Sequence, residues 1–254
     1  MKFNEENHSY FNDSGETYLS GTAFIKKFCK PFDREKRAKA YAKKHKRKIE
    51  DVLADWDKAG NDAILKGTFY HKIKEEELLG KDLIDIEGDD HPIFKPSWDG
   101  KIKTHDKQKL EPGVYPELIV WSDKYKIAGQ ADKVEITKTG KLNIKDYKTS
   151  KEIKKQSYPN WDGSPKLMKF PLHSLEDCNY FHYALQLNLY AFLIKQHNRN
   201  LTINKLEIEH VIGTYDDEEE KFILEKIITY KVPNLQKEIK IALDYYKTNG
   251  NKII

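Results

Sequence analysis

Hydrophobic and polar residues alternate through the middle of the chain in three short runs. The runs are ELIVWS at 117–122, YKIAGQADKVEI at 125–136 and KLNIKDYKT at 141–149. An alternation with a period of two places successive side chains on opposite faces of a sheet, so each run predicts a strand. The connections DK and KTGK are short turns, and we therefore expect the three strands to be antiparallel neighbours.

Helical periodicity surrounds these strands. Apolar residues recur every three or four positions from Arg34 to about Trp56, and a second helix is expected over 57–79. The later elements are a helix at 177–197, strands at 204–213 and 222–232, and a closing helix after Pro233. This order predicts an α/β fold in which helices flank one mixed sheet.

Three segments carry turn signals instead of periodicity. Residues 8–25 predict a hairpin that turns at 12–15, followed by a short helix with Ser20 as its N-cap. Residues 80–110, rich in Gly, Asp and Pro, are expected to be irregular or weakly paired. Residues 151–177 carry three prolines and a glycine and are expected to form an ordered loop or lid.

The size and composition of the chain suit one globular domain. Of its 254 residues, 38% are hydrophobic, which is enough to bury a core. We expect a single domain over 1–254, with an N-terminal hairpin and basic helical subdomain at 1–66 and a core at 67–254. The N-terminus has no apolar signal region, and no stretch approaches the length of a membrane-spanning helix. We therefore expect a cytoplasmic protein with no membrane partner.

Positive charge is concentrated in one helix, although the net formal charge is only +4. Residues 33–48, DREKRAKAYAKKHKRK, hold nine Lys or Arg and two acids. Such a stripe is either a solvated helix face or a surface that contacts a phosphate backbone. The residues that a DNA contact would use are Arg37, Tyr41, Lys44, Arg47 and Lys48.

Cysteine content limits the metal chemistry. The chain has two cysteines, Cys29 and Cys178, and no CxxC motif. Two thiolates cannot hold a four-cysteine iron–sulfur cluster or a four-cysteine zinc site, so we expect neither. Free thiols in a reducing compartment are the expected state of both residues.

An acid inside an apolar strand is the strongest chemical signal. Asp132 lies among Ile, Ala and Val residues, where a carboxylate is costly unless it is paired or binds a metal. With a turn centred near residue 139, Asp132 faces Asp146 on the next strand, and Lys148 projects from the same face as Asp146. Two facing carboxylates repel each other unless a cation such as Mg²⁺ lies between them. For Asp146 and Lys148 alone, a surface salt pair is the alternative.

Two helices carry further candidates. His71 lies one turn before Glu75, and Gln186 and Tyr190 share one face of the helix that contains QLNLY. A single helical His is more often a surface or core residue than a ligand. A Gln among apolar neighbours is less ordinary.

In order and spacing, these motifs resemble those of the PD-(D/E)XK nucleases of the RecB type. The resemblance extends to phage-encoded exonucleases and the mitochondrial genome maintenance exonuclease. The matching strings are G-T-x-x-H at 67–71, G-x-x-D at 129–132, D-Y-K-T at 146–149 and Q-x-x-x-Y at 186–190. Each string is weak alone, but four in register over about residues 10–195 are specific. The resemblance implies a restriction-endonuclease-like core.

The resemblance also implies roles for these residues. Asp132 and Asp146 would bind Mg²⁺ or Mn²⁺, with the Tyr147 carbonyl as a third oxygen and His71 as an additional ligand. Lys148 would orient or deprotonate the attacking water and offset charge in the transition state. The missing cluster cysteines exclude the iron–sulfur branch of the superfamily.

The same resemblance gives weaker indications for three other residues. Gln186 and Tyr190 would support the site and contact the DNA strand. Glu117 matches an acid that family members carry before the G-x-x-D motif, although the residue could equally be part of a plain surface.

The implied reaction is hydrolysis of DNA phosphodiester bonds. We expect an exonuclease that acts from DNA ends, on single-stranded DNA or tails, in phage or bacterial replication, recombination or repair. Two alternatives stay open: an endonuclease or flap nuclease on the same fold, and an inactive nuclease-fold DNA-binding protein. The expected partners are DNA and replication or recombination proteins, in the cytoplasm of a bacterial or phage-infected cell.

Overall fold

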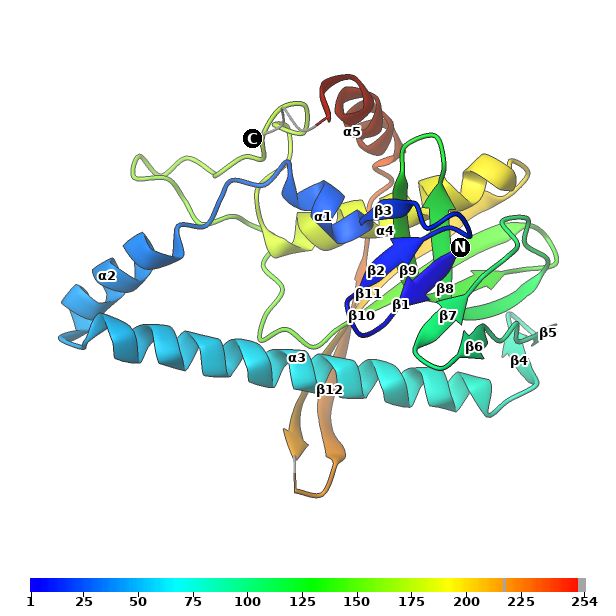
Figure 1. Cartoon of the computed structure of the whole chain (residues 1–254), viewed down its shortest axis with the longest axis horizontal. Coiled ribbons are helices and arrows are strands. Elements are labelled where there is room, and N and C mark those ends of the chain that lie inside the picture. The colour runs from blue at the N-terminus through cyan, green and yellow to red at the C-terminus, as the bar shows by residue number, and fades with distance from the viewer. Residues whose placement is uncertain (217, 251–254) are drawn as a thin grey trace.

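The computed structural model describes residues 1–216 and 218–250 and shows helices flanking a ten-stranded sheet (Figure 1); two further strands, the fourth and fifth in chain order, pair with each other in a separate two-stranded sheet. The strands are β1 (Lys2–Asn4), β2 (Ser9–Phe11), β3 (Thr17–Ser20), β4 (Leu83–Ile86), β5 (Asp89–Pro92), β6 (Ser97–Asp99), β7 (Ile102–Thr104), β8 (Gly113–Ser122), β9 (Ile127–Ile136), β10 (Lys141–Lys148), β11 (Thr202–Asp216) and β12 (Lys221–Lys231). The helices are α1 (Gly21–Lys26), α2 (Arg34–His45), α3 (Ile49–Leu79), α4 (Asn179–His197) and α5 (Gln236–Asn249). The expected α/β fold with a mixed central sheet is confirmed.

The three predicted antiparallel strands form the centre of the sheet. β8 pairs antiparallel with β9, and β9 pairs antiparallel with β10. β11 then lies parallel to β10, and β12 is antiparallel to β11. The parallel step requires a crossover connection, which the chain supplies through the 151–177 segment and α4.

The sheet forks beside β9. Residues 133–136 of β9 pair with β10, whereas Ile127 and Ala128 pair with β3, which runs parallel to β9. Within the part of the chain that the structure describes, residues 129–131 pair with β8 alone, and Asp132 pairs with neither neighbouring strand. The G-x-x-D segment therefore lies in an opening of the sheet.

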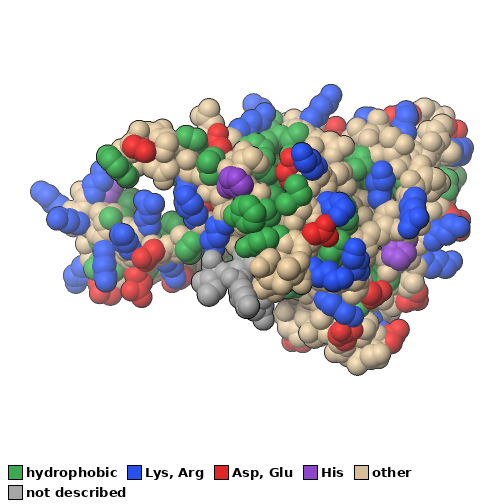
Figure 2. Space-filling view, turned by 90° about the horizontal axis from the view of Figure 1, so that it is seen from above, with side chains coloured by type: hydrophobic (Ala, Val, Ile, Leu, Met, Phe, Trp, Pro, Cys, Tyr) green, Lys and Arg blue, Asp and Glu red, His purple; other side chains and the backbone are tan. Residues whose placement is uncertain are grey.

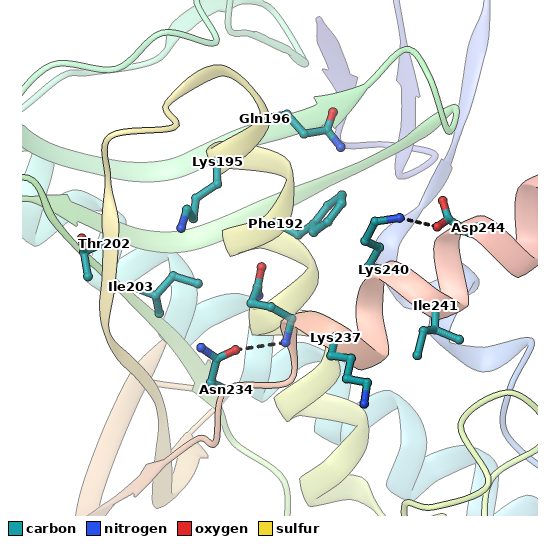
Figure 3. Close-up of a pocket in the computed structure, with 11 residues that line it drawn as sticks. Phe192, Lys195, Gln196, Thr202, Ile203, Asn234, Lys237, Lys240, Ile241 and Asp244 are labelled. Carbon is teal, nitrogen blue, oxygen red and sulfur yellow. Dashed lines mark hydrogen bonds and ion pairs between the residues drawn. The ribbon is translucent and has the colours of Figure 1, made fainter.

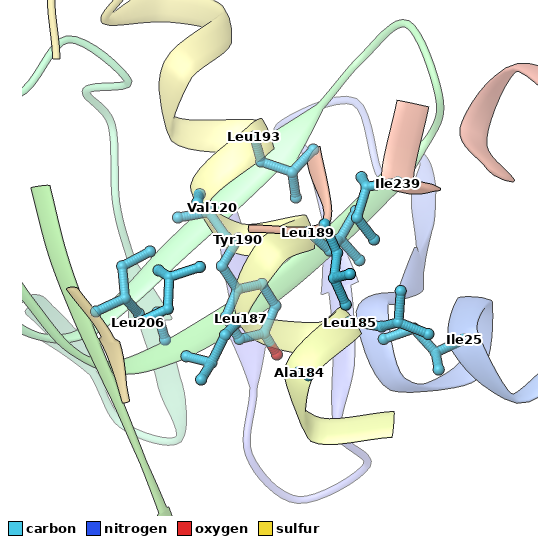
Figure 4. Close-up of a cluster of buried hydrophobic side chains, with 14 of the residues drawn as sticks. Ile25, Val120, Ala184, Leu185, Leu187, Leu189, Tyr190, Leu193, Leu206 and Ile239 are labelled. Carbon is cyan, nitrogen blue, oxygen red and sulfur yellow. The ribbon is translucent and has the colours of Figure 1, made fainter. Parts of the chain in front are cut away.

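The main core lies between the sheet and the helices α1, α4 and α5. α4 has apolar side chains around most of its circumference, as expected for a buried helix. Figure 4 shows its side chains among residues of four other elements: Ile25 of α1, Val120 of β8, Leu206 of β11 and Ile239 of α5. Leu185 and Leu187 are fully buried, so α4 is held firmly in place.

The N-terminal hairpin forms as expected and joins the large sheet. β2 and β3 are antiparallel, and the Ser20 hydroxyl accepts a hydrogen bond from the Ala23 amide at the start of α1. β2 continues through β1 and β7 to β6, which extends the sheet on the β3 side of the fork. The boundary expected at residue 66 falls inside α3, so this helix connects the two parts of the chain.

The helix boundaries of the basic region differ from the expectation. The predicted helices at 34–56 and 57–79 are instead a short α2 and a 31-residue α3. The break comes at Lys46, whose left-handed conformation (φ 51°) caps α2 while the Arg47 amide bonds to the Ala42 carbonyl. α3 then folds back so that Val52 packs against α2.

The 151–177 segment is irregular, and part of it is anchored. Met168 and Leu172 lie in the main core, and the Lys169 amide bonds to the Phe28 carbonyl. Trp161, by contrast, is 99% exposed. Among the described residues, no helix combines the length and apolar character needed to cross a membrane.

Candidate active site

Two neighbouring strands place a pair of carboxylates in the sheet opening. Asp132 of β9 and Glu117 of β8 are each 7% exposed. Glu117 has a φ of 50°, a left-handed conformation that is rare for a residue other than glycine inside a strand. Such backbone strain costs on the order of 1–3 kcal/mol and clusters at functional sites. The strand backbone is therefore distorted at one of the two acids.

His71 of α3 completes a three-residue cluster. Its Nδ1 lies 3.5 Å from Asp132 Oδ2 and 3.8 Å from Glu117 Oε1. Its other nitrogen, Nε2, lies 3.1 Å from the carbonyl oxygen of Tyr147. One ligand atom from each of His71, Glu117 and Asp132 lies within 4.8 Å of the others. An imidazole and two carboxylates at this spacing can hold one divalent cation.

The electrostatics of the cluster favour a cation. Burial raises the pKa of Asp132, an effect that His71 opposes and Glu117 reinforces. Burial alone lowers the pKa of His71, but the charges of Asp132 and Glu117 outweigh this effect and raise it to about 9. A proton on His71 thus partly neutralises the two acids, and a metal ion at the same place would neutralise them more fully.

Asp146 and Lys148 lie beside this cluster as an ion pair. Lys148 Nζ is 2.6 Å from Asp146 Oδ2 and 5.1 Å from the centre of the Tyr183 ring. Burial raises the pKa of Asp146 to about 6, although Lys148 opposes the shift. Burial lowers the pKa of Lys148, but Asp146 and Asp132 outweigh it, so the net shift is upward. Lys148 is therefore a partly buried cation, with a side chain 19% exposed, held at the edge of the cluster.

The Tyr147 backbone connects β10 to the acids. Its amide donates to Asp132 Oδ2 at 2.6 Å, while its carbonyl faces His71. The pairing of β9 with β10 ends at Lys133 and Lys145, so Asp132 and Asp146 lie one position beyond the last paired residues instead of forming the expected cross-strand pair. Both carboxylates belong to one site, with Asp132 in the cluster and Asp146 paired to Lys148.

Gly129 of the G-x-x-D string packs against Tyr190 of the Q-x-x-x-Y string so closely that no side chain fits at position 129. A Cβ at position 129 would lie 2.4 Å from Cε1 of Tyr190. The Tyr190 hydroxyl accepts a hydrogen bond of 2.8 Å from Gln186 Nε2. Tyr190 itself is only 3% exposed, so it packs under the strand rather than standing free for DNA. The G-x-x-D and Q-x-x-x-Y strings are therefore in direct contact with each other.

Gly129→Ala is expected to destabilise the chain by about 1–3 kcal/mol, because the new methyl group overlaps the Tyr190 ring. The free energy of unfolding from urea titration measures the effect. Gly60→Ala, in an open position on α3, is the matched control and should be neutral or stabilising by about 1 kcal/mol. Equal stability of Gly129→Ala and the wild type would contradict this packing.

Three site residues had no role assigned from the sequence. Gln130 donates a hydrogen bond to Glu117 Oε2, and Tyr183 lies under Lys148. Burial raises the pKa of Tyr10, and the charges of Glu117 and Asp132 add to this effect, which places Tyr10 beside the acids. The signals were present: Gln130 shares the Asp132 face of an apolar strand, and Tyr183 precedes Gln186 and Tyr190 at helical spacing.

The cluster opens into a cavity of about 890 Å³. His71, Glu117, Asp132, Gln186 and Tyr190 line it, as do residues of the N-terminal strands and of the last turns of α3. Four of the predicted residues on α3, β9 and α4 therefore share one solvent-accessible space with Glu117.

The predicted DNA-contact residues of the basic region 33–48 lie away from this cavity. Arg37, Tyr41, Lys44, Arg47 and Lys48 are exposed, and Figure 2 shows Lys and Arg side chains gathered at the α2 end of the molecule. Arg47 forms an ion pair of 2.7 Å with Asp55. At 1.5 Å per residue, α3 separates its first residue from His71 by roughly 33 Å. These residues could therefore contact only a part of a bound DNA strand that lies far from the cavity.

A second cavity, of about 790 Å³, lies between α4, β11 and α5 (Figure 3). An ion pair of 2.5 Å between Lys240 and Asp244 lies at its wall. None of the predicted site residues lines this cavity, and within the described ranges it contains no carboxylate–histidine cluster. The first cavity is therefore the candidate active site.

Comparison with known proteins yields little. No protein-family model matches the sequence, and no curated protein matches it. Among solved structures, the crystal structure of SSO0001 aligns with a TM-score of 0.31 and 15% identity, over 91% of this chain and 74% of that chain. A likeness of this size does not establish a common fold.

Proposed function

We propose that this chain is a metal-dependent DNA exonuclease with a PD-(D/E)XK core. The observation that carries the proposal is the convergence of His71, Glu117 and Asp132 on one point beside the Lys148–Asp146 pair. His71 and Tyr147 are 76 positions apart in the chain, yet their atoms lie 3.1 Å from each other. Three of the four strings that resemble nuclease motifs line one cavity, and the fourth, D-Y-K-T, lies next to it through the contacts of Tyr147 with Asp132 and His71.

The donor set suits a hard divalent cation. Carboxylate oxygens of Asp132 and Glu117 and the His71 Nδ1 that faces them are ligands that Mg²⁺ or Mn²⁺ accepts. The Tyr147 carbonyl, expected from the sequence as a further ligand, contacts Nε2 on the other side of the ring and lies outside this set. The Asp146 carboxylate would either become a further ligand of this cation or remain in its ion pair with Lys148. When bound, the cation would polarise a phosphoryl oxygen and favour ionisation of the attacking water.

The residues of the chain would perform the remaining tasks. Lys148 holds a positive charge next to the carboxylates, where it can orient a water molecule and offset the negative charge that develops on the phosphoryl group. Tyr183, under the ammonium, and Asp146, beside it, restrict its position. The Tyr190 ring, which is hydrogen-bonded to Gln186, packs against Gly129 and supports the G-x-x-D segment of β9.

DNA is the proposed substrate because phosphodiester hydrolysis matches this site and the molecule carries a separate basic surface. The α2 end concentrates Lys and Arg, and the 151–177 segment exposes Trp161 and Tyr158. Charge combined with exposed aromatic rings suits a single strand of any sequence.

A cleavage assay on three DNA substrates tests the proposal. End-labelled single-stranded DNA, end-labelled duplex and a closed circular single strand are incubated with Mg²⁺, Mn²⁺ or EDTA. Shortening of linear DNA with either metal, an intact circle and no reaction in EDTA are the expected results. Cutting of the circle would replace exonuclease by endonuclease. Metal-independent binding without cleavage would replace both by a DNA-binding protein.

A further inference from the structure

A second cluster of metal-ligating side chains lies outside the candidate active site. It consists of Cys29, which follows α1, Asp177, which precedes α4, and His182 on the first turns of α4. Cys29 Sγ lies 3.2 Å from His182 Nε2, and the same nitrogen lies 2.8 Å from Asp177 Oδ1. One ligand atom from each residue lies within 4.8 Å of the others.

We propose that Cys29, Asp177 and His182 form a zinc site that fastens the segment after α1 to the start of α4. Thiolate, imidazole and carboxylate are all established zinc ligands. At normal zinc bond lengths, tetrahedral ligand atoms lie about 3.3–3.6 Å apart. The observed 3.2 Å and 2.8 Å need only a small opening of the cluster to reach this spacing.

Contacts around the cluster fix the orientation of its ligands. The side chain of Asp177 is 5% exposed, and its Oδ2 accepts a hydrogen bond of 2.9 Å from the Lys30 amide. Oδ1 is therefore directed toward the other two residues. Lys166 Nζ lies 3.6 Å from Oδ2, on the oxygen that the metal would not use. Outer contacts of this kind are typical supports of metal ligands.

A cysteine-based catalytic triad does not explain the same geometry. In such a triad the thiol and the carboxylate contact opposite nitrogens of the imidazole. Here both contact the same nitrogen, Nε2, so the thiol and the carboxylate do not lie on opposite sides of the ring as a triad requires. Three potential metal-ligand atoms that face one point are instead the arrangement expected of residues that bind the same cation.

The site would link distant parts of the chain. Cys29 and His182 are 153 positions apart, and His182 lies one turn before Gln186 on α4. A metal there would fix the end of α4 that leads to the Gln186–Tyr190 contact. The sulfur ligand separates its chemistry from the oxygen-rich cluster at Asp132, because Mg²⁺ avoids thiolates. This zinc site does not depend on the proposed nuclease activity.

Cobalt titration of the metal-free full chain tests the site. Co²⁺ bound to a thiolate gives a charge-transfer absorption in the near ultraviolet, which carboxylate and imidazole ligands do not give. One equivalent of Co²⁺ should produce this band in the wild type, and Zn²⁺ should abolish it by displacement. Cys29→Ser should lose the band and bind Zn²⁺ roughly 100-fold more weakly or worse.

Matched variants separate the outcomes. Cys178→Ser, which removes the other thiol, and Asp132→Asn, in the first cluster, should both keep the band. His182→Gln should lose it, and this variant decides the question if Cys29→Ser does not fold. Absence of the band in the wild type would overturn the proposal, as would its persistence in Cys29→Ser.

Discussion

Asp132→Asn is expected to abolish metal-dependent DNA cleavage without lowering the stability of the chain. The change removes one of two charged oxygen donors in the cluster, so the cleavage rate should fall by roughly 10²–10³-fold or more. The asparagine oxygen can still accept the hydrogen bond from the Tyr147 amide. Because burial and Glu117 already disfavour the charge on Asp132, its removal should leave the melting temperature unchanged or about 2–4 °C higher.

Cleavage rates, calorimetric Mn²⁺ binding and thermal unfolding measured on the same preparation check this expectation. Asp90→Asn is the matched control, since Asp90 is an exposed carboxylate on β5, outside the cavity. It should match the wild type in all three measurements. An Asp132→Asn protein that cleaves normally would remove Asp132 from the mechanism, whereas one that fails to fold would show that the carboxylate has a structural role.

Lys148→Met should also abolish cleavage, but with metal binding retained. The methionine fills the place of the lysine stem and removes only the positive charge, so the rate should fall by roughly 10²–10³-fold while Mn²⁺ affinity stays near the wild-type value. The change also leaves Asp146 buried without its cation, which should cost up to about 3 kcal/mol of stability. The double variant Lys148→Met, Asp146→Asn should recover stability and remain inactive.

Lys145→Met is a close control for this experiment. Lys145 lies on the same strand, three residues before Lys148, and forms a similar ion pair of 2.7 Å with the buried Glu209. It should lose stability but keep cleavage. Equal loss of activity in the two methionine variants would indicate that β10 is merely unfolded by such changes, and would sink the catalytic assignment of Lys148.

Much of the core fold could be predicted because local patterns of hydrophobic and polar residues determine its strands and helices. The alternation in 117–149 and the apolar run of α4 set the strand and helix types, and the short turns set the antiparallel pairing. The break at Lys46 could not be predicted in the same way, because no glycine or proline marks it. Its cause is tertiary: the packing of α3 against α2 holds a lysine in a left-handed conformation.

The candidate site was predictable to a similar degree. The register that the sequence predicts for β9 and β10 is confirmed as far as Lys133 and Lys145, and the pairing ends there, one position short of Asp132 and Asp146. The joint position of His71 and Glu117 with Asp132 does not follow from any local pattern. It depends on how α3 crosses the sheet and on the left-handed turn of the Glu117 backbone, neither of which leaves a periodic signal. The catalytic roles themselves stay predictions.

The elements that surround the opening beside β9 come from distant parts of the sequence, which affects when the site forms during folding. The cluster needs α3, β8, β9 and β10, and the Tyr190 ring that supports it arrives only with α4. Contacts between residues so distant in sequence close late, since their loop entropy must be overcome first. During synthesis, the carboxylates and the lysine would therefore be present long before they are aligned. A nascent or truncated chain that ends before α4 should have no aligned site, so activity would appear only when the whole core has formed.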